Sequence, residues 1–345
     1  MLDKVGPIIL DLKGTEITEE EKDILRNPLV GGVILFTRNY DNPTQLSELC
    51  LSIRNTRKLP FLIAVDQEGG GVQRFKNGFT EIPSMGKIGK LYDLNKNKAL
   101  LFAKTCAWVL SSELIAAGLD ISFAPVLDLK QAENPAIGER SFHENPEAVI
   151  NLAKAWIEGV HEAGMSVTGK HFPGHGSVLL DSHVDLPKDT RSYNEIEKTD
   201  LKIYESLITN HLDAIMPAHI VFTSVDEYPA GFSHYWLKDV LRKRYKFNGL
   251  IFSDDLNMFG ASFAGSYTDR AYSALSAGCD MVLVCNNRKA AIEVIDSLST
   301  KHYVDEYKFN KIKIFNKLLL KDLQDQKKWV NANKNINNFL KNFKK

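Results

Sequence analysis

The sequence predicts an α/β protein whose fold class is a closed (β/α)8 barrel of the TIM type. Eight short apolar runs alternate with intervals long enough to hold a helix, and polar residues with useful chemistry follow most of these runs. An open sheet that binds a dinucleotide would need a glycine-rich phosphate-binding turn after its first strand, and residues 11–15 do not form one. We therefore expect the carboxyl ends of eight parallel strands to meet at one mouth.

The predicted strands are rich in Val, Ile, Leu and Phe, as expected for parallel strands buried on both faces. They span residues 7–12, 32–36, 60–65, 119–124, 165–168, 214–216, 249–252 and 281–284. The intervals between them carry helix signals. One helix is expected to begin at Asn42 and Pro43, and others are expected over 96–117, 146–163 and 196–211.

The chain beyond the eighth strand has a different composition. Residues 301–345 contain 12 lysines and 4 acidic residues. We expect residues 1–290 to form the catalytic barrel and residues 291–345 to form a helical segment of the same domain. One or two amphipathic helices would pack on the barrel there, with their lysines facing solvent.

The composition argues against several kinds of partner. The 43 basic and 43 acidic residues balance, so no overall field attracts the protein to nucleic acid or to a membrane surface. No signal-peptide pattern opens the chain, and the four cysteines lie in apolar stretches without a CxxC pair. We expect buried free thiols, a cytoplasmic location and a monomer.

The stretch from Lys170 to His183 gathers three histidines, a lysine and an aspartate after a predicted strand. Lys170 and His171 are suited to donate hydrogen bonds to hydroxyls or carboxylates of a ligand. Asp181 stands two residues before His183, so its carboxylate can bind the ring and raise its proton affinity. The pair is therefore a candidate general acid.

Two other interpretations of this stretch stay open on the residues alone. His171, His175, His183 and Asp254 would satisfy the ligand count of a zinc site, although the proline and glycine between the first two histidines make their spacing unspecific. Lys170 could instead form a Schiff base, which would leave the acidic residues unexplained.

Other strand ends carry polar side chains as well. Asp254 directly follows an apolar strand and is expected to point into the mouth as a catalytic carboxylate, whereas Asp255 is expected to cap the next helix. Asp66 ends the third strand and can accept bonds from two neighbouring hydroxyls. Arg140 offers a rigid donor fork, and His219 ends the sixth strand.

Together these segments resemble glycoside hydrolase family 3. The matching motifs are KHFPGHG followed by Asp181-Ser182-His183, FSDDL around Asp254, VDQEGG around Asp66, GERSF around Arg140, and PAGFS at 229–233. They occur in the family's order, from about residue 5 to residue 287. Within the family, the match is to the single-domain bacterial β-N-acetylglucosaminidases (β-hexosaminidases) of peptidoglycan recycling.

The resemblance implies a retaining exo-hydrolase that removes terminal N-acetylglucosamine from peptidoglycan fragments, the 1,6-anhydro-muropeptides, through a covalent glycosyl-aspartate. It implies Asp254 as nucleophile and His183 as acid/base, assisted by Asp181, with no metal or cofactor. The residues it implies for holding the sugar are Asp66, Arg74, Arg140, Lys170, His171 and His219. One departure is Gly71, where the family usually has an arginine, although Arg74 matches the motif's second arginine.

Three alternatives remain at this stage. The first is the metal-dependent hydrolase described above, which a chelator would inactivate. The second is a sugar-binding protein without turnover. The presence of both Asp254 and His183 argues against it. The third is phosphorolysis instead of hydrolysis, because a neutral imidazole repels phosphate less than a carboxylate does.

Overall fold

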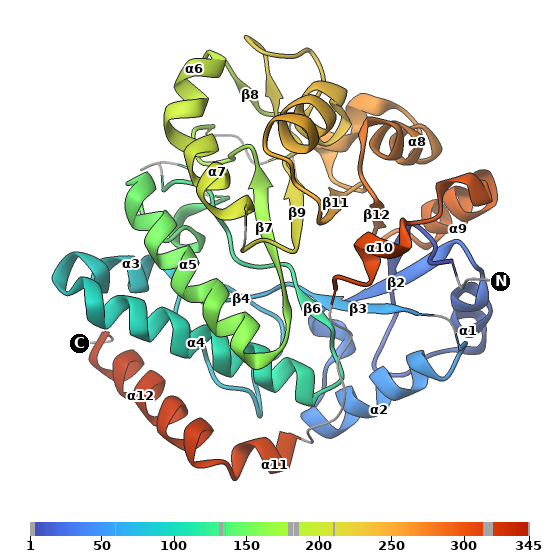
Figure 1. Ribbon diagram of the computed structural model, residues 1–345. Helices are drawn as coiled ribbons and strands as arrows, with labels where there is room; N and C mark the ends of the chain where they lie inside the picture. Colours follow the sequence, from blue (N-terminus) through green and yellow to red (C-terminus); the bar gives the residue numbers. More distant parts are fainter. Residues whose placement is uncertain are drawn as a thin grey trace.

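The structure is a computed structural model of the 345-residue chain. It describes residues 4–58, 60–130, 134, 136–178, 182, 186–209, 211–312 and 320–343. Eight parallel strands close into a barrel with helices around it (Figure 1). Around the barrel, the strands are β1 (Ile8–Asp11), β2 (Val30–Leu35), β3 (Leu62–Val65), β6 (Ile121–Ser122), β7 (Ser166–Phe172), β9 (Ala214–Pro217), β11 (Leu250–Asp255) and β12 (Met281–Val284). Each overlaps a predicted strand, so the (β/α)8 barrel is confirmed.

Helices α1 to α8 fill the intervals between the strands, α9 to α12 follow the last strand, and all lie outside the barrel (Figure 1). They are α1 (Glu19–Arg26), α2 (Pro43–Arg54), α3 (Met85–Leu94), α4 (Lys96–Ala116), α5 (Pro146–Ala163), α6 (Tyr193–Ile196), α7 (Lys202–Ile208), α8 (Tyr267–Ala277), α9 (Arg288–Ser297), α10 (Glu306–Phe309), α11 (Leu320–Gln324) and α12 (Lys327–Phe343). A π-helical stretch joins α6 to α7, and another spans Tyr235–Arg244.

The helix ends follow the sequence signals. The Asn42 side chain accepts a hydrogen bond from the Gln45 backbone N–H, and Pro43 takes the first position of α2, where its missing N–H costs nothing. At the other end of a helix, Gly164 follows α5 with a φ of 97°, a left-handed conformation that glycine adopts without strain. The chain can then turn directly into β7.

Two strands extend further than predicted. β7 continues through Phe172, so Lys170 and His171 lie within the strand and not in the loop after it. β11 likewise includes Asp254 and Asp255. Two small sheets were not predicted: the antiparallel pair β4 (Gln67–Gly69) and β5 (Val72–Gln73), and the parallel pair β8 (Lys188–Asp189) and β10 (Val221–Phe222). The first of these pairs carries pocket residues.

Apolar side chains fill the inside of the barrel below the mouth. They include Ile9, Leu62, Phe123, Phe252 and Met281, all buried. The rings of Phe123 and Phe252 meet edge to face with their centroids 5.2 Å apart. This packing closes the barrel from below, so a ligand reaches the interior only from the carboxyl ends of the strands. All four cysteines are buried and free, as predicted.

The C-terminal helices α11 and α12 pack against α4, as expected (Figure 1). The rings of Phe102 on α4 and Phe339 on α12 lie 4.4 Å apart between their centroids. α4 is long and apolar enough, by length and composition, to cross a membrane. However, 61% of its apolar window is buried inside the protein, as in the core helix of a globular fold.

One buried carboxyl group connects α12 to the body of the protein. Glu113 on α4 is 1% exposed and accepts hydrogen bonds from the Thr80 N–H (2.9 Å), the Thr80 hydroxyl (2.5 Å) and Trp329 Nε1 (2.9 Å). Burial raises the pKa of Glu113 to about 7, against the hydrogen bonds that lower it. Its charge in the folded state therefore changes near neutral pH.

We expect Glu113 to make the protein less stable as the pH rises from about 4.5 to 7. In this window the unfolded chain has lost the proton and the folded protein still holds it, so each step in pH favours unfolding. For a shift from 4.5 to about 7, the loss is on the order of 3 kcal/mol. Urea denaturation of the wild type and of Glu113→Gln at pH 4.5 and pH 8 measures it, because the variant lacks this contribution. Equal pH dependence of the two proteins would contradict the assignment.

Candidate active site

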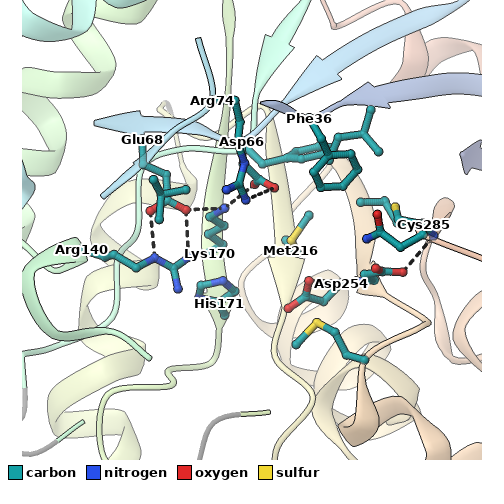
Figure 2. A pocket seen from close by; sticks show the side chains of 17 residues that line it. Phe36, Asp66, Glu68, Arg74, Arg140, Lys170, His171, Met216, Asp254 and Cys285 are labelled. Atoms are coloured by element: carbon teal, nitrogen blue, oxygen red, sulfur yellow. Dashed lines mark hydrogen bonds and ion pairs between the residues drawn. The ribbon is translucent and has the colours of Figure 1, made fainter. Parts of the chain in front are cut away.

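A pocket of about 340 Å³ opens at the mouth of the barrel (Figure 2). Its apolar lining includes Phe36, Phe123, Met216, Met258 and Leu283. Its polar lining comes from the carboxyl ends of the strands and the loops after them: Asp66, Glu68, Arg74, Arg140, Lys170, His171, Asp254, Asp255 and Asn286. The convergence expected at the mouth is thus observed for most of the predicted residues.

Lys170 lies at the centre of a buried ionic cluster. Its ammonium group is 2.9 Å from Asp66 Oδ1 and 2.7 Å from Glu68 Oε1. Arg140 binds Glu68 with two parallel hydrogen bonds, of 2.9 Å from Nε and 2.8 Å from Nη2. Lys170 and Glu68 are 3% and 2% exposed. The cluster holds Lys170 and Arg140 in fixed positions at the pocket wall.

The charges in this cluster set its protonation. Burial alone would raise the pKa of Glu68, but Arg140 and Lys170 overcome that effect and hold the pKa well below its usual range. Burial alone would lower the pKa of Lys170, and Asp66 and Glu68 outweigh it and raise the pKa. Lys170 is therefore protonated at neutral pH, which argues against the Schiff-base alternative, since that chemistry needs a free amine.

Asp66 and Arg74 face the pocket beside this cluster. Arg74 Nη2 is 3.7 Å from Asp66 Oδ2, and Arg74 Nε finds no hydrogen-bond partner among the described residues. Gln67 Oε1 accepts the backbone N–H of Arg74 at 2.8 Å, so the β4–β5 hairpin positions the arginine. Asp66 Oδ2 and the guanidinium can each bind a polar group of a ligand. Gly71, where the family's first arginine would stand, is exposed with open space around it.

His171 is oriented by a buried carboxylate. Asp128 Oδ2 lies 2.7 Å from His171 Nδ1, and the same carboxylate accepts the backbone N–H groups of His171 and His175. Burial would raise the pKa of Asp128, but the neighbouring histidines lower it overall. An ionised Asp128 makes Nδ1 the donor toward it, and we infer that Nε2 of His171 is left for a ligand.

Asp254 lies across the pocket from the ionic cluster (Figure 2). Its Oδ1 accepts the backbone N–H of Asp255 at 2.8 Å. Asp255 also borders the pocket, but its Oδ1 accepts the N–H groups of Asn257 (2.9 Å) and Cys285 (3.0 Å). Burial raises the pKa of Asp255 to about 7. Asp255 holds the wall together, and the predicted helix cap is wrong, because the next helical turn (Phe259–Ala264) begins after Met258.

His219 lies behind the pocket wall. It is 0% exposed, stacks on Phe232 with ring centroids 5.3 Å apart, and is absent from the pocket lining. Its Nε2 is 3.2 Å from the carbonyl oxygen of Asp255, which fits a hydrogen bond donated by the ring. The structure therefore does not bring His219 into the pocket with the other predicted sugar contacts, and places it in contact with the backbone of Asp255.

The predicted acid/base pair, Asp181 and His183, lies outside the described residues. The residue between them, Ser182, is described and buried. In the part of the chain that the structure describes, no group of three or more His, Cys, Asp and Glu is arranged to hold a metal ion. His175 Nε2 is instead 3.0 Å from the Ser182 hydroxyl.

Comparison with known protein families shows where the chain belongs. The sequence of residues 3–312 matches the family described as the glycosyl hydrolase family 3 N-terminal domain. The chain belongs to glycosyl hydrolase family 3. It is therefore a glycoside hydrolase, as the motifs predicted.

Known relatives are similar in sequence to this family 3 enzyme along most of its length. A β-hexosaminidase of Tolumonas auensis is 56% identical over 295 residues, covering 85% of this chain and 87% of that protein. A β-hexosaminidase of Haemophilus influenzae is 51% identical over 85% of this chain and 83% of its own length. The crystal structure of NagZ from Neisseria gonorrhoeae in complex with N-trifluoroacetyl-D-glucosamine is 40% identical, with a TM-score of 0.91 over 97% of this chain and 98% of that one.

Proposed function

We propose that the protein is a retaining exo-β-N-acetylglucosaminidase that removes a non-reducing terminal N-acetylglucosamine from peptidoglycan fragments, the 1,6-anhydro-muropeptides. The observation that carries the proposal is the position of Asp254, which faces a fixed set of hydrogen-bond donors and acceptors across a pocket of about 340 Å³. The β-hexosaminidase relatives, and the N-trifluoroacetyl-D-glucosamine in NagZ, support the choice of sugar.

Some pocket residues hold the sugar in place, and others take part in the reaction. Lys170, Arg74 and Arg140 donate to ring hydroxyls and to the acetamido carbonyl, Asp66 accepts from two neighbouring hydroxyls, and His171 contributes Nε2. Phe36, Met216 and Met258 cover the apolar faces of the sugar. Holding the ring at several points fixes the anomeric carbon in front of Asp254.

The reaction proceeds in two displacements. Asp254 attacks the anomeric carbon as the bond to the leaving oxygen breaks, and His183 gives that oxygen its proton, which leaves a glycosyl-aspartate. Neutral His183 then takes a proton from water, whose oxygen attacks the same carbon and releases Asp254. Asp181 stabilises the imidazolium form of His183 between these steps. Two inversions give overall retention.

An imidazole in place of the second carboxylate suits a reaction near neutral pH. A histidine paired with an aspartate titrates near pH 7, so it can be protonated in the first step and neutral in the second. Phosphate could replace water in the second step, because a neutral imidazole does not repel it. We propose hydrolysis as the main reaction, carried out by a cytoplasmic monomer that acts on small wall fragments and on neither nucleic acid nor membrane. The four buried free thiols are compatible with a reducing compartment.

Release of 4-nitrophenol from its β-N-acetylglucosaminide, beside the β-glucoside and with or without EDTA, tests the proposal. We expect turnover that EDTA does not affect and a preference for the acetamido sugar of roughly 100-fold or more, since unpaired buried donors reject the glucoside. Proton NMR of the first product should show the β anomer. No turnover, loss of activity in EDTA, or the α anomer would each overturn the mechanism. Added phosphate, with sugar phosphate as the product, would identify phosphorolysis.

A further inference from the structure

Asn286, two residues after the end of β12, has an unusual backbone conformation at the mouth of the barrel. Its φ is 59°, in the left-handed region, and among the described residues other than glycine only Lys246 shares this feature. Asparagine tolerates the conformation better than most residues do, but it still costs free energy. Asn286 also lines the pocket. Backbone strain beside a pocket directs attention to the side chain that it presents there.

Contacts within the protein fix Asn286 from two sides. Its backbone N–H donates to Asp11 Oδ1 at 3.0 Å, and its side-chain Oδ1 accepts a hydrogen bond from Arg38 Nη1 at 2.9 Å. Arg38 is itself held, because its Nε donates to the Leu12 carbonyl oxygen at 3.0 Å and its Nη2 pairs with Asp11. A guanidinium can only donate hydrogen bonds, so the atom of the amide that faces it is the oxygen. The amide nitrogen, Nδ2, is left for another partner.

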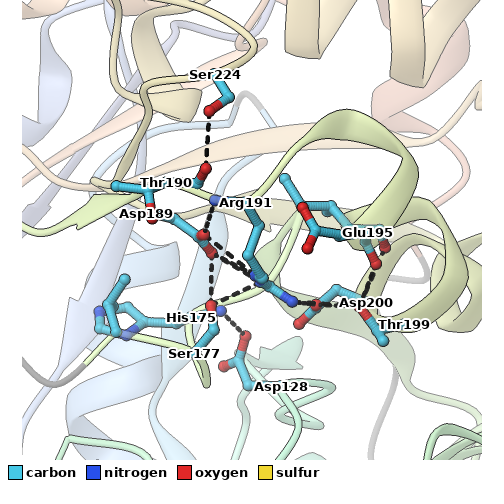
Figure 3. A network of polar contacts seen from close by, with 12 residues as sticks. Asp128, His175, Ser177, Asp189, Thr190, Arg191, Glu195, Thr199, Asp200 and Ser224 are labelled. Carbon is cyan, nitrogen blue, oxygen red and sulfur yellow. Dashed lines mark hydrogen bonds and ion pairs between the residues drawn. The ribbon is translucent and has the colours of Figure 1, made fainter.

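A second arginine fork in the protein has no such outlet. Arg191 donates to Ser177 Oγ at 2.6 Å, to Asp189 Oδ2 at 2.7 Å and to Asp200 Oδ2 at 2.8 Å (Figure 3). None of these three acceptors lines the pocket, so this network serves the fold. The fork of Arg38 differs, because it ends on a pocket residue whose Nδ2 makes no hydrogen bond to another described residue.

The side of the pocket around Asn286 differs from the ionic cluster. Figure 2 shows Cys285, its neighbour in the chain, on the side of Asp254 and across the pocket from Lys170. Phe36 also borders the pocket. Apart from the carboxylates at the end of β11, this side therefore offers apolar surface and one neutral amide donor.

We propose that Asn286 is a further substrate-binding residue, whose Nδ2 donates a hydrogen bond to the 6-hydroxyl oxygen of the terminal sugar. The inference rests on the proposed function, in which the cations across the pocket bind the ring hydroxyls and the acetamido group, and Asp254 faces the anomeric carbon. With those contacts made, the edge of the ring that turns to Asn286 carries the ring oxygen and the hydroxymethyl group. The methylene of that group meets Phe36, and its hydroxyl meets the amide.

The contact with Arg38 makes Asn286 an effective donor. A mobile asparagine loses side-chain freedom when it binds a ligand, whereas this amide is already held in one orientation before the sugar arrives. A sugar without the 6-hydroxyl leaves the amide without its partner and is bound less well. Asn286 therefore makes the enzyme prefer a sugar with a hydroxymethyl group at C5.

The test combines one variant with two substrates. Asn286→Gly removes the amide and suits the backbone, because glycine adopts a φ of 59° without strain. The substrates are 4-nitrophenyl β-N-acetylglucosaminide and its 6-deoxy analogue. We expect the variant to lose roughly 10-fold of kcat/KM on the first and less than about 2-fold on the second, since the analogue has already lost the contact. The ratio of the two values does not depend on how much of the sample is folded.

Lys246→Gly is the matched control. Lys246 is exposed, has a φ of 55° and does not line the pocket, so the same kind of substitution should leave kcat/KM unchanged on both substrates. An equal loss on both substrates in Asn286→Gly, or no loss on either, would overturn the contact with the 6-hydroxyl while leaving the proposed function intact. A wild type that hydrolyses neither substrate would instead overturn the proposed function.

Discussion

Asp254→Asn is expected to lose at least about 10⁴-fold of kcat/KM, because an amide cannot form the glycosyl ester on which the proposed two-step reaction depends. The substitution preserves the shape of the side chain. Its Oδ1 can still accept the backbone N–H of Asp255, so the strand end should keep its geometry. The melting temperature should change little, and a single-turnover assay with 4-nitrophenyl β-N-acetylglucosaminide measures the loss.

Asp255→Asn is the matched control for this experiment. Asp255 borders the same pocket one residue later, but Asn at this position still offers Oδ1 to the N–H groups of Asn257 and Cys285. Because burial already raises the pKa of Asp255 to about 7, the fold tolerates a neutral group there. We expect the control to lose less than about 10-fold. A larger loss in the control than in Asp254→Asn would mean that Asp255, and not Asp254, is the attacking carboxylate.

Azide should rescue a variant that lacks the proposed nucleophile. In Asp254→Ala the space vacated by the carboxylate admits a small anion, which can attack the anomeric carbon from the same side. The product is then the α-glycosyl azide, formed with a single inversion. Absence of rescue together with residual formation of the β product would mean that Asp254 is not the attacking group.

The barrel could be predicted from the sequence because buried parallel strands are apolar on both faces and stand out as short runs. The same rule ended two predicted strands too early, because it stops a strand at its last apolar residue. Lys170, His171, Asp254 and Asp255 are polar, and yet each lies within its strand and lines the pocket. At the carboxyl end of a barrel strand, polarity therefore indicates the site and not the end of the strand.

Residues that act by tertiary pairing were not recognisable as site residues. Glu68 was part of a motif without a role, and its partner Arg140 stands 72 residues later. Asp128 lies in an irregular stretch after β6, and its bond to His171 spans 43 residues. No local pattern encodes such pairs. His219 illustrates the converse, because its position after a strand suggested the pocket and its packing on Phe232 places it behind the wall.

Lys170→Met is expected to destabilise the fold by about 3 kcal/mol at pH 8, because it leaves two carboxylates close together in a buried site without the cation between them. Arg140 still pairs with Glu68, so the expected loss of stability is at the lower end of the range for a broken buried ion pair. Lys243→Met removes the same side chain from an exposed pair with Asp239, and it should leave the free energy of unfolding nearly unchanged. Urea denaturation of both variants measures the difference.

The pH dependence of this loss identifies its cause. In the wild type, Arg140 and Lys170 keep the pKa of Glu68 well below its usual range. Without Lys170, the pKa of Glu68 rises, so protonation relieves the repulsion and the stability penalty of Lys170→Met shrinks as the pH falls. A penalty that stays the same from pH 8 to pH 5 would assign the loss to packing instead of charge. At pH 8 and 20 °C the remaining folded protein should also show kcat/KM lowered by roughly 100-fold or more, because the cation that holds Asp66 and lines the pocket is gone.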